Sequence, residues 1–151
     1  MTTRSASDRD LDVANEIAGM LFQVTEEMRR VFESTARHLE LTPPQARALL
    51  ELERPVPMRS IAERLRCDAS NVTGIADRLE SRGLVTREPD PTDRRVKTLV
   101  LTVKGRRARA KLERAVFSSP VMVGLNRTER TVLRRLLTKM GAAAAARSCP
   151  P

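Results

Sequence analysis

A long amphipathic pattern opens the chain. Over residues 8–40, apolar side chains such as Leu11, Ile17, Leu21 and Met28 recur at steps of three and four residues, and no proline interrupts them. This spacing predicts a single helix with one apolar stripe. At about 1.5 Å per residue, that helix is roughly 45–50 Å long. Such a stripe is longer than one small domain buries, so we expect a partner helix from this chain or from a second copy.

A second helix is predicted directly after the first. Thr42 and Gln45 form a capping-box pattern, and Pro43 is the residue type favoured at the first helical position. This helix should extend to about residue 53, because the prolines within residues 54–57 break the pattern there.

Two short helices separated by a tight turn are predicted next. Residues 60–66 form the first, and a turn leads to the second over residues 69–82. Asp68 is a candidate N-cap for the second helix, and Gly83 suits the left-handed conformation that ends it. Helix, turn and helix in this order are typical of DNA-binding domains.

The period of the pattern changes to two at residue 84. Residues 84–87 and 96–101 predict two antiparallel strands, joined by a polar loop at 88–95 that contains two prolines and no apolar residue. The two segments therefore predict a β-hairpin with a polar tip.

Two more helices complete the chain. Thr102 and Asn126 are candidate N-caps for helices over residues 103–117 and 127–146, with a break at residues 118–120. The expected fold is thus mainly α-helical with one small antiparallel β-hairpin.

Charge is distributed unevenly along the chain. The 151 residues carry 28 Lys and Arg against 19 Asp and Glu, a formal net charge of +9. Residues 1–40 hold five basic and eight acidic residues, so this segment has a net charge of −3 and the remainder +12. A basic balance of this size points to a polyanionic partner, most often nucleic acid, and it places that partner downstream of residue 40.

Composition excludes several classes of protein. Trp and Tyr are absent, which argues against stacking of single-stranded bases on aromatic platforms. Two cysteines and one histidine are too few for a disulfide framework or a zinc site, so no cofactor and no metal are expected. No motif places a nucleophile beside a base, so we do not expect an enzyme. Without an apolar stretch of about 18 residues or a signal peptide, we expect no membrane association and a cytoplasmic location.

The helix predicted at 69–82 and the polar loop at 88–95 carry the candidate contact residues. Short polar side chains near a helix N-terminus reach base edges and phosphates, and a glycine permits close approach. Arginines at a flexible hairpin tip can enter a minor groove. We interpret Asp77 as an ion-pair partner and expect Asp93 to orient one of these arginines. The candidate DNA-contacting residues are Ser70, Asn71, Thr73, Gly74, Arg78, Asp93, Arg94 and Arg95.

These motifs resemble the MarR family of bacterial transcription regulators. They stand in the family's order as LTPPQ at 41–45, SIAERL at 60–65, SNVTGIADRLESRGLV at 70–85, DPTDRR at 90–95 and LVLTVKG at 99–105. Each motif alone is a weak signal, whereas the ordered set over residues 41–107 is specific.

The resemblance implies a domain organisation and a mode of action. A winged helix-turn-helix domain is expected at 41–102, a helical dimerisation domain at 8–40 and 103–146, and tails at 1–7 and 147–151. The implied function is that of a ligand-responsive repressor acting as a homodimer on a pseudo-palindromic DNA operator. Its recognition helices would enter successive major grooves about 34 Å apart, with the wings in the flanking minor grooves.

An effector site is also implied by the resemblance. Many relatives bind small phenolic or other aromatic anions in a cleft between the dimerisation and DNA-binding domains. The candidate lining residues here are Phe22, Met28, Phe32 and His38. The first three are core or dimer-interface residues first and pocket lining second, and a lone histidine is more often structural.

Two alternative functions stay open. Cys67 precedes a helix N-terminus, where a thiolate is stabilised, so the same fold is compatible with a regulator that is switched by thiol oxidation. Cys149 falls in the predicted tail. The other alternative is a basic protein that binds DNA or RNA through phosphate contacts without sequence preference.

Overall fold

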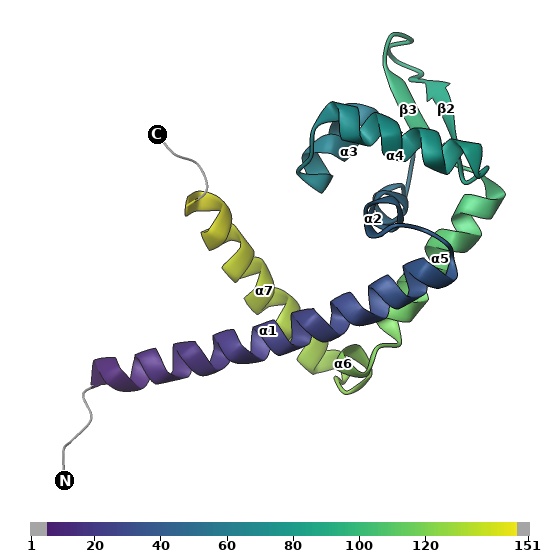
Figure 1. The fold of residues 1–151 in the computed structure, drawn as a ribbon. Helices are drawn as coiled ribbons and strands as arrows, with labels where there is room; N and C mark the ends of the chain where they lie inside the picture. Colours follow the sequence, from purple (N-terminus) through teal and green to yellow (C-terminus); the bar gives the residue numbers. More distant parts are fainter. Residues whose placement is uncertain (1–5, 148–151) are drawn as a thin grey trace.

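The computed structural model describes residues 6–147, and its helices outweigh a small sheet (Figure 1). The elements follow the chain as α1 (Ala6–His38), α2 (Pro43–Glu51), β1 (Val56–Pro57), α3 (Met58–Leu65), α4 (Ala69–Ser81), β2 (Val85–Pro89), β3 (Lys97–Leu101), α5 (Val103–Phe117), α6 (Pro120–Val123) and α7 (Arg127–Arg147). Each helix predicted from the sequence is present, with ends shifted by one or two residues, and the predicted fold class is confirmed.

The core lies between α2, α3, α4, the sheet and α5. Its largest fully buried side chains come from all of these elements, and they include Leu49, Ile61, Leu79, Leu99 and Leu112. The end of α1 joins this core through Ala36, which is completely buried. The middle of the chain is therefore a closed domain that needs only the last turns of α1 to complete it.

The sheet has three strands in the order β1-β3-β2, all antiparallel. Val85 pairs with Leu101, which fixes the register of the predicted hairpin. The second helix ends before residues 54–57, as predicted, but these residues also contain an edge strand that the sequence did not predict, because Val56 pairs with Leu99. The strand has two residues and is flanked by prolines, so it leaves no alternating pattern to recognise; proline is tolerated at a sheet edge because no donor is needed there.

Local capping interactions set several helix ends. The hydroxyl of Thr102 accepts a hydrogen bond from the backbone N–H of Gly105 at 3.0 Å, and the amide of Asn126 accepts one from Glu129 at the same distance. The backbone N–H of Thr42 donates to Gln45 at 3.1 Å. Asp68 occupies the N-cap position of α4 with an extended backbone, but its side chain makes no capping bond. The side chains of Thr102 and Asn126 thus make the predicted capping bonds, and at α2 the Gln45 side chain caps the backbone of Thr42.

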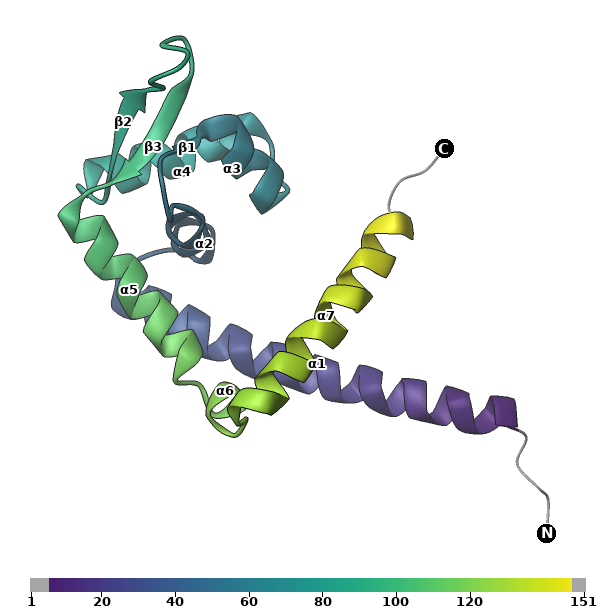
Figure 2. The ribbon, with the colours of Figure 1, turned by 180° about the vertical axis from the view of Figure 1, so that it is seen from behind.

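Two helices leave the closed domain. α1 runs far past it, and α7 projects away beyond α6 (Figures 1 and 2). Both expose large apolar side chains, namely Leu11, Ile17, Met20 and Phe22 on α1 and Val132, Leu136, Leu137 and Met140 on α7. No helix within the described residues is both long and apolar enough to cross a membrane.

Candidate nucleic-acid interface

The outward face of α4 is polar and accessible. Val72, Ala76 and Leu79 are buried, which turns the opposite face of this helix to solvent. The five candidates on that face are all exposed, as the sequence predicts: Ser70, Asn71, Thr73, Gly74 and Arg78.

A tight turn places α4 across α3. Arg66 ends α3 in the left-handed conformation, with φ of 52°. The backbone N–H of Cys67 then donates to the carbonyl of Ala62 at 3.1 Å, which closes the turn. Left-handed backbone is uncommon for residues other than glycine, so tertiary packing must hold this turn.

The wing tip between β2 and β3 is ordered by Asp90. Its carboxylate accepts hydrogen bonds from the backbone N–H of Thr92 at 2.8 Å, from the Thr92 hydroxyl at 2.5 Å and from the backbone N–H of Asp93 at 3.3 Å. These bonds, led by the one from the Thr92 side chain, lower the pKa of Asp90. The loop therefore has a defined turn even though it consists almost entirely of polar residues.

The two arginines of the wing point away from the core. Arg94 and Arg95 are exposed, and within the described part of the chain no acidic group or carbonyl binds either guanidinium. The carboxylate of Asp93 accepts the backbone N–H of Arg95 at 3.0 Å. Asp93 thus contacts one of the two arginines, as expected, through the main chain of Arg95, and it shapes the turn.

The wing and α4 lie at the same end of the molecule. In both ribbon views the β2–β3 hairpin rises beside α4, at the end remote from the long free part of α1 (Figures 1 and 2). A single flat or grooved partner can thus contact the polar face of α4 and the arginines of the wing together.

Arg87 of β2 locks the wing to α4. Its guanidinium donates to Asp77 at 2.5 Å, to Glu80 at 2.8 Å and to the carbonyl of Thr73 at 3.4 Å. Glu80 also accepts the backbone N–H of Arg87 at 3.2 Å. The prediction that Asp77 is an ion-pair partner is confirmed. Arg87 itself was not singled out from the sequence, because its partners lie seven to fourteen positions away on another element.

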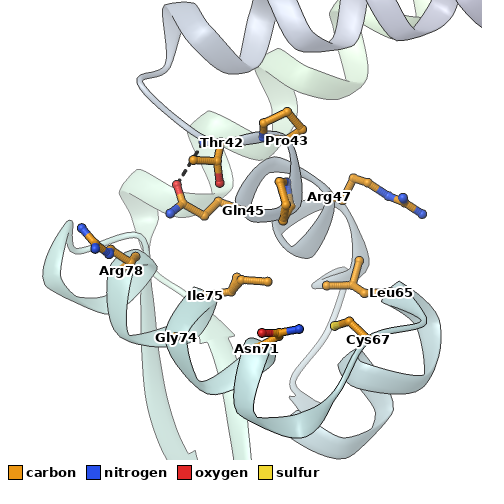
Figure 3. Close-up of a pocket in the computed structure, with 11 residues that line it drawn as sticks. Thr42, Pro43, Gln45, Arg47, Leu65, Cys67, Asn71, Gly74, Ile75 and Arg78 are labelled. Atoms are coloured by element: carbon orange, nitrogen blue, oxygen red, sulfur yellow. Dashed lines mark hydrogen bonds between the residues drawn. The ribbon is translucent and has the colours of Figure 1, made fainter.

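A pocket of about 540 Å³ separates α4 from the N-terminal end of α2 (Figure 3). Asn71, Gly74, Ile75 and Arg78 form its α4 side. The remaining lining residues belong to the start of α2 and to the α3–α4 turn, and they are Thr42, Pro43, Pro44, Gln45, Arg47, Leu65 and Cys67.

The four effector candidates lie elsewhere. Phe22 is 77% exposed on the free part of α1, and His38 is exposed with Nδ1 2.7 Å from the carbonyl of Ser34. Met28 is half-buried, and Phe32 packs partly against the core. None of the four lines the pocket beside α4. In a single chain the four effector candidates thus share helix α1 but do not line this pocket together.

Cys67 is half-buried beside that pocket and carries a free thiol. Cys149, the other cysteine, lies outside the described residues. Among the residues that the structure describes, no group of three His, Cys, Asp or Glu side chains is arranged to hold a metal ion.

A helix-turn-helix, a basic wing and an accessible second helix define a winged helix-turn-helix protein. Residues 41–97 match the model of the MarR family. The HTH-type transcriptional regulator TtmR of Methylorubrum extorquens (strain PA1) is 29% identical over 140 residues, which are 91% of this chain and 72% of that protein. Residues 41–97 are thus a MarR-family domain, and the chain is similar to transcription regulators of the MarR type.

Two further relatives support this assignment. The organic hydroperoxide resistance transcriptional regulator of Bacillus subtilis (strain 168) is 27% identical over 128 residues, which are 83% of this chain and 85% of that protein. CouR from Rhodococcus jostii RHA1, solved with p-coumaroyl-CoA bound, has 27% identity and a TM-score of 0.70, covering 84% of this chain and 92% of CouR.

Proposed function

We propose that the protein is a homodimeric repressor that binds a pseudo-palindromic operator in double-stranded DNA. The observation that carries the proposal is that α4, with its exposed polar face, and the wing, with its exposed arginines, lie side by side at one end of the molecule. A duplex presents a major groove and a flanking minor groove to such a surface, and no other part of the described chain offers both features.

Each element has a separate role in this proposal. Ser70, Asn71, Thr73 and Arg78 contact base edges and adjacent phosphates in the major groove, while Gly74 allows the helix to approach closely. Arg94 and Arg95 reach the minor groove, which attracts arginine where it is narrow. Asp93 holds the turn that presents them.

A second copy of the chain is the proposed partner of α1 and α7. Their exposed leucines, valines and methionines would leave large apolar areas in water in a monomer, and soluble proteins rarely expose such continuous stripes. Residues 8–40 and 103–146 accordingly form the proposed dimerisation domain.

A small aromatic or anionic effector is proposed to release the DNA. CouR holds p-coumaroyl-CoA, an aromatic thioester that carries phosphates, and the proposal extends ligand response to this chain by similarity. Phe22, Met28, Phe32 and His38 remain the proposed lining residues, completed by the second copy because α1 alone does not enclose them.

Thiol oxidation is the second candidate for the switch. Cys67 lies at the start of the recognition helix, and the Bacillus subtilis relative is named for resistance to organic hydroperoxides. Oxidation of a half-buried thiol beside α4 would place new polar volume against Ile75 and Asn71, which line the same pocket.

Selection of bound duplexes from a random-sequence pool, followed by footprinting, tests the proposal. The expected result is a palindrome with half-sites one helical turn apart, protected over two major grooves. Equal affinity for all duplexes, with a steep salt dependence and no protected palindrome, would instead establish the alternative of a non-specific nucleic-acid-binding protein.

A further inference from the structure

Three helix ends meet at one joint behind the recognition surface. They are the C-terminus of α1, the C-terminus of α4 and the N-terminus of α5. The turns that follow α1 and α4 present backbone carbonyls at residues 39, 40, 82 and 83, and side chains from other elements donate to them. These bonds help to hold α4 in place.

Arg82, at the end of α4, supplies donors to the turn that follows α1. Its guanidinium donates to the backbone carbonyls of Leu39, at 3.1 Å, and of Glu40, and to the Glu40 carboxylate at 3.0 Å. Glu40 is left-handed, with φ of 53°, and this conformation is uncommon for a residue other than glycine. One side chain thus binds the strained turn that ends α1 from more than forty positions away in sequence.

The N-terminal end of α5, with its N-cap residue, supplies donors to the turn that follows α4. The Lys104 ammonium donates to the carbonyl of Arg82 at 2.8 Å, and the Thr102 hydroxyl donates to the carbonyl of Gly83 at 2.7 Å. The recognition helix is therefore tied to both of the helices that lead into the proposed dimerisation domain.

We infer that Arg82 is a positioning residue that couples the orientation of α4 to α1, and so sets the half-site spacing that a dimer accepts. The inference rests on the proposed function, because spacing has meaning only for two α4 helices on one operator. Arg82 itself need not touch DNA. It acts through the direction of α4, since loss of its three bonds would leave that helix tied only to α5 and to the core of its own domain.

The range of half-site spacings that a dimer can bind depends on how firmly each recognition helix is held relative to α1. One extra base pair between half-sites moves them apart by about 3.4 Å and rotates them by about 35°. A rigid dimer cannot follow that change without losing contacts, whereas a dimer with loose domains can. The looser dimer also binds its best operator less tightly, because its domains lose conformational entropy when they become ordered on DNA.

The test measures affinity for a series of operators. The operator selected by the wild-type protein is resynthesised with one or two base pairs added or removed between its half-sites. Binding of each duplex is measured by fluorescence anisotropy for the wild type, Arg82→Gln, Arg82→Lys and Arg107→Gln. Arg107 is the matched control: it is an exposed arginine of α5 close to Arg82, and within the described residues its side chain has no hydrogen-bond or ion-pair partner.

We expect the wild type and Arg107→Gln to bind the altered operators about tenfold more weakly or worse, equivalent to ~1.4 kcal/mol. The affinity of Arg82→Gln should change by less than about threefold across the same series, because its loosely held DNA-binding domains can follow the altered spacing. Arg82→Lys retains the charge but cannot reach three acceptors, so its profile should be intermediate. The Lys variant decides the matter if Arg82→Gln does not fold.

Three results would overturn the inference. A wild-type spacing profile in the Arg82 variants shows that the joint does not set spacing, whatever their thermal stability. If Arg82→Gln and Arg107→Gln lose the dependence of affinity on half-site spacing to the same extent, the loss of a positive charge explains the effect and the hydrogen bonds of Arg82 do not. If the wild type itself has no spacing preference, the proposed dimeric function fails and the inference falls with it.

Discussion

Replacement of Gly105 by alanine is the sharpest stability prediction. Gly105 is buried in the first turn of α5, where it packs against the backbone of Leu84. A Cβ at this position would overlap the Leu84 carbonyl oxygen and lie 2.9 Å from its carbonyl carbon and 3.0 Å from Cδ2 of Leu101. Two of these three atoms belong to the backbone, so no side-chain rotation relieves the overlap.

The energetic consequence follows from what must move. Leu84 also accepts a hydrogen bond from the backbone N–H of Thr102 at 3.1 Å, and displacement of α5 breaks or lengthens it. Overpacking of a filled core costs about 1–3 kcal/mol, and a lost hydrogen bond about 1 kcal/mol more. Alanine regains up to about 1 kcal/mol through its higher helix propensity. We therefore expect Gly105→Ala to lower the free energy of unfolding by about 1–3 kcal/mol.

Gly74→Ala is the matched control for this measurement. Gly74 is also helical, but a Cβ there would meet no atom within 4 Å. It should raise the free energy of unfolding by about 0.5–1 kcal/mol. Urea unfolding followed by far-ultraviolet circular dichroism suits a chain without Trp or Tyr, with all proteins at one concentration because assembly contributes to stability. Gly105→Ala unfolding at or above the wild-type midpoint would refute the packing argument.

Three further predictions concern function. Arg95→Ala should weaken operator binding by ~1–3 kcal/mol and reduce the slope of log affinity against log salt by about one; unchanged affinity and slope in a titration at several salt concentrations would remove Arg95 from the wing role. Lysines at Leu21 and Leu136 should yield monomers by light scattering, whereas Arg95→Ala should stay dimeric; dimers in the lysine variant would place the interface elsewhere. Cys67→Ser should abolish peroxide-induced release of DNA if the thiol is the switch, and release that persists in this variant excludes that mechanism.

The helices were predictable because their signals are local. Periodicity alone placed α1, and the sequence positions of Thr102 and Asn126 located the starts of α5 and α7, where both side chains make the expected capping bonds. The exposure of the α4 candidates followed from the same periodicity, since burial of Val72 and Leu79 determines which face is outward.

The contacts that hold the interface together were not predictable, because they join distant parts of the chain. Asp77 was assigned an ion pair, but only the fold identifies Arg87 as its partner. In the sequence Arg82 is only part of a helix end, and its acceptors in the turn after α1 are 42 and 43 positions away. The effector candidates depend on a second copy, so neither the sequence nor a single chain assembles their cavity.

The Arg87 lock has an electrostatic consequence for how the protein would search DNA. Asp77 and Glu80 balance Arg78 and Arg87, so the recognition helix and its lock together carry no net charge. The long-range electrostatic attraction to any duplex must then come from the wing arginines and other basic positions. α4 contacts the bases without adding net positive charge to that attraction. Non-specific affinity for DNA and discrimination between sequences would then reside in separate elements. Substitutions on α4 could change the preferred operator sequence while the non-specific affinity stays the same.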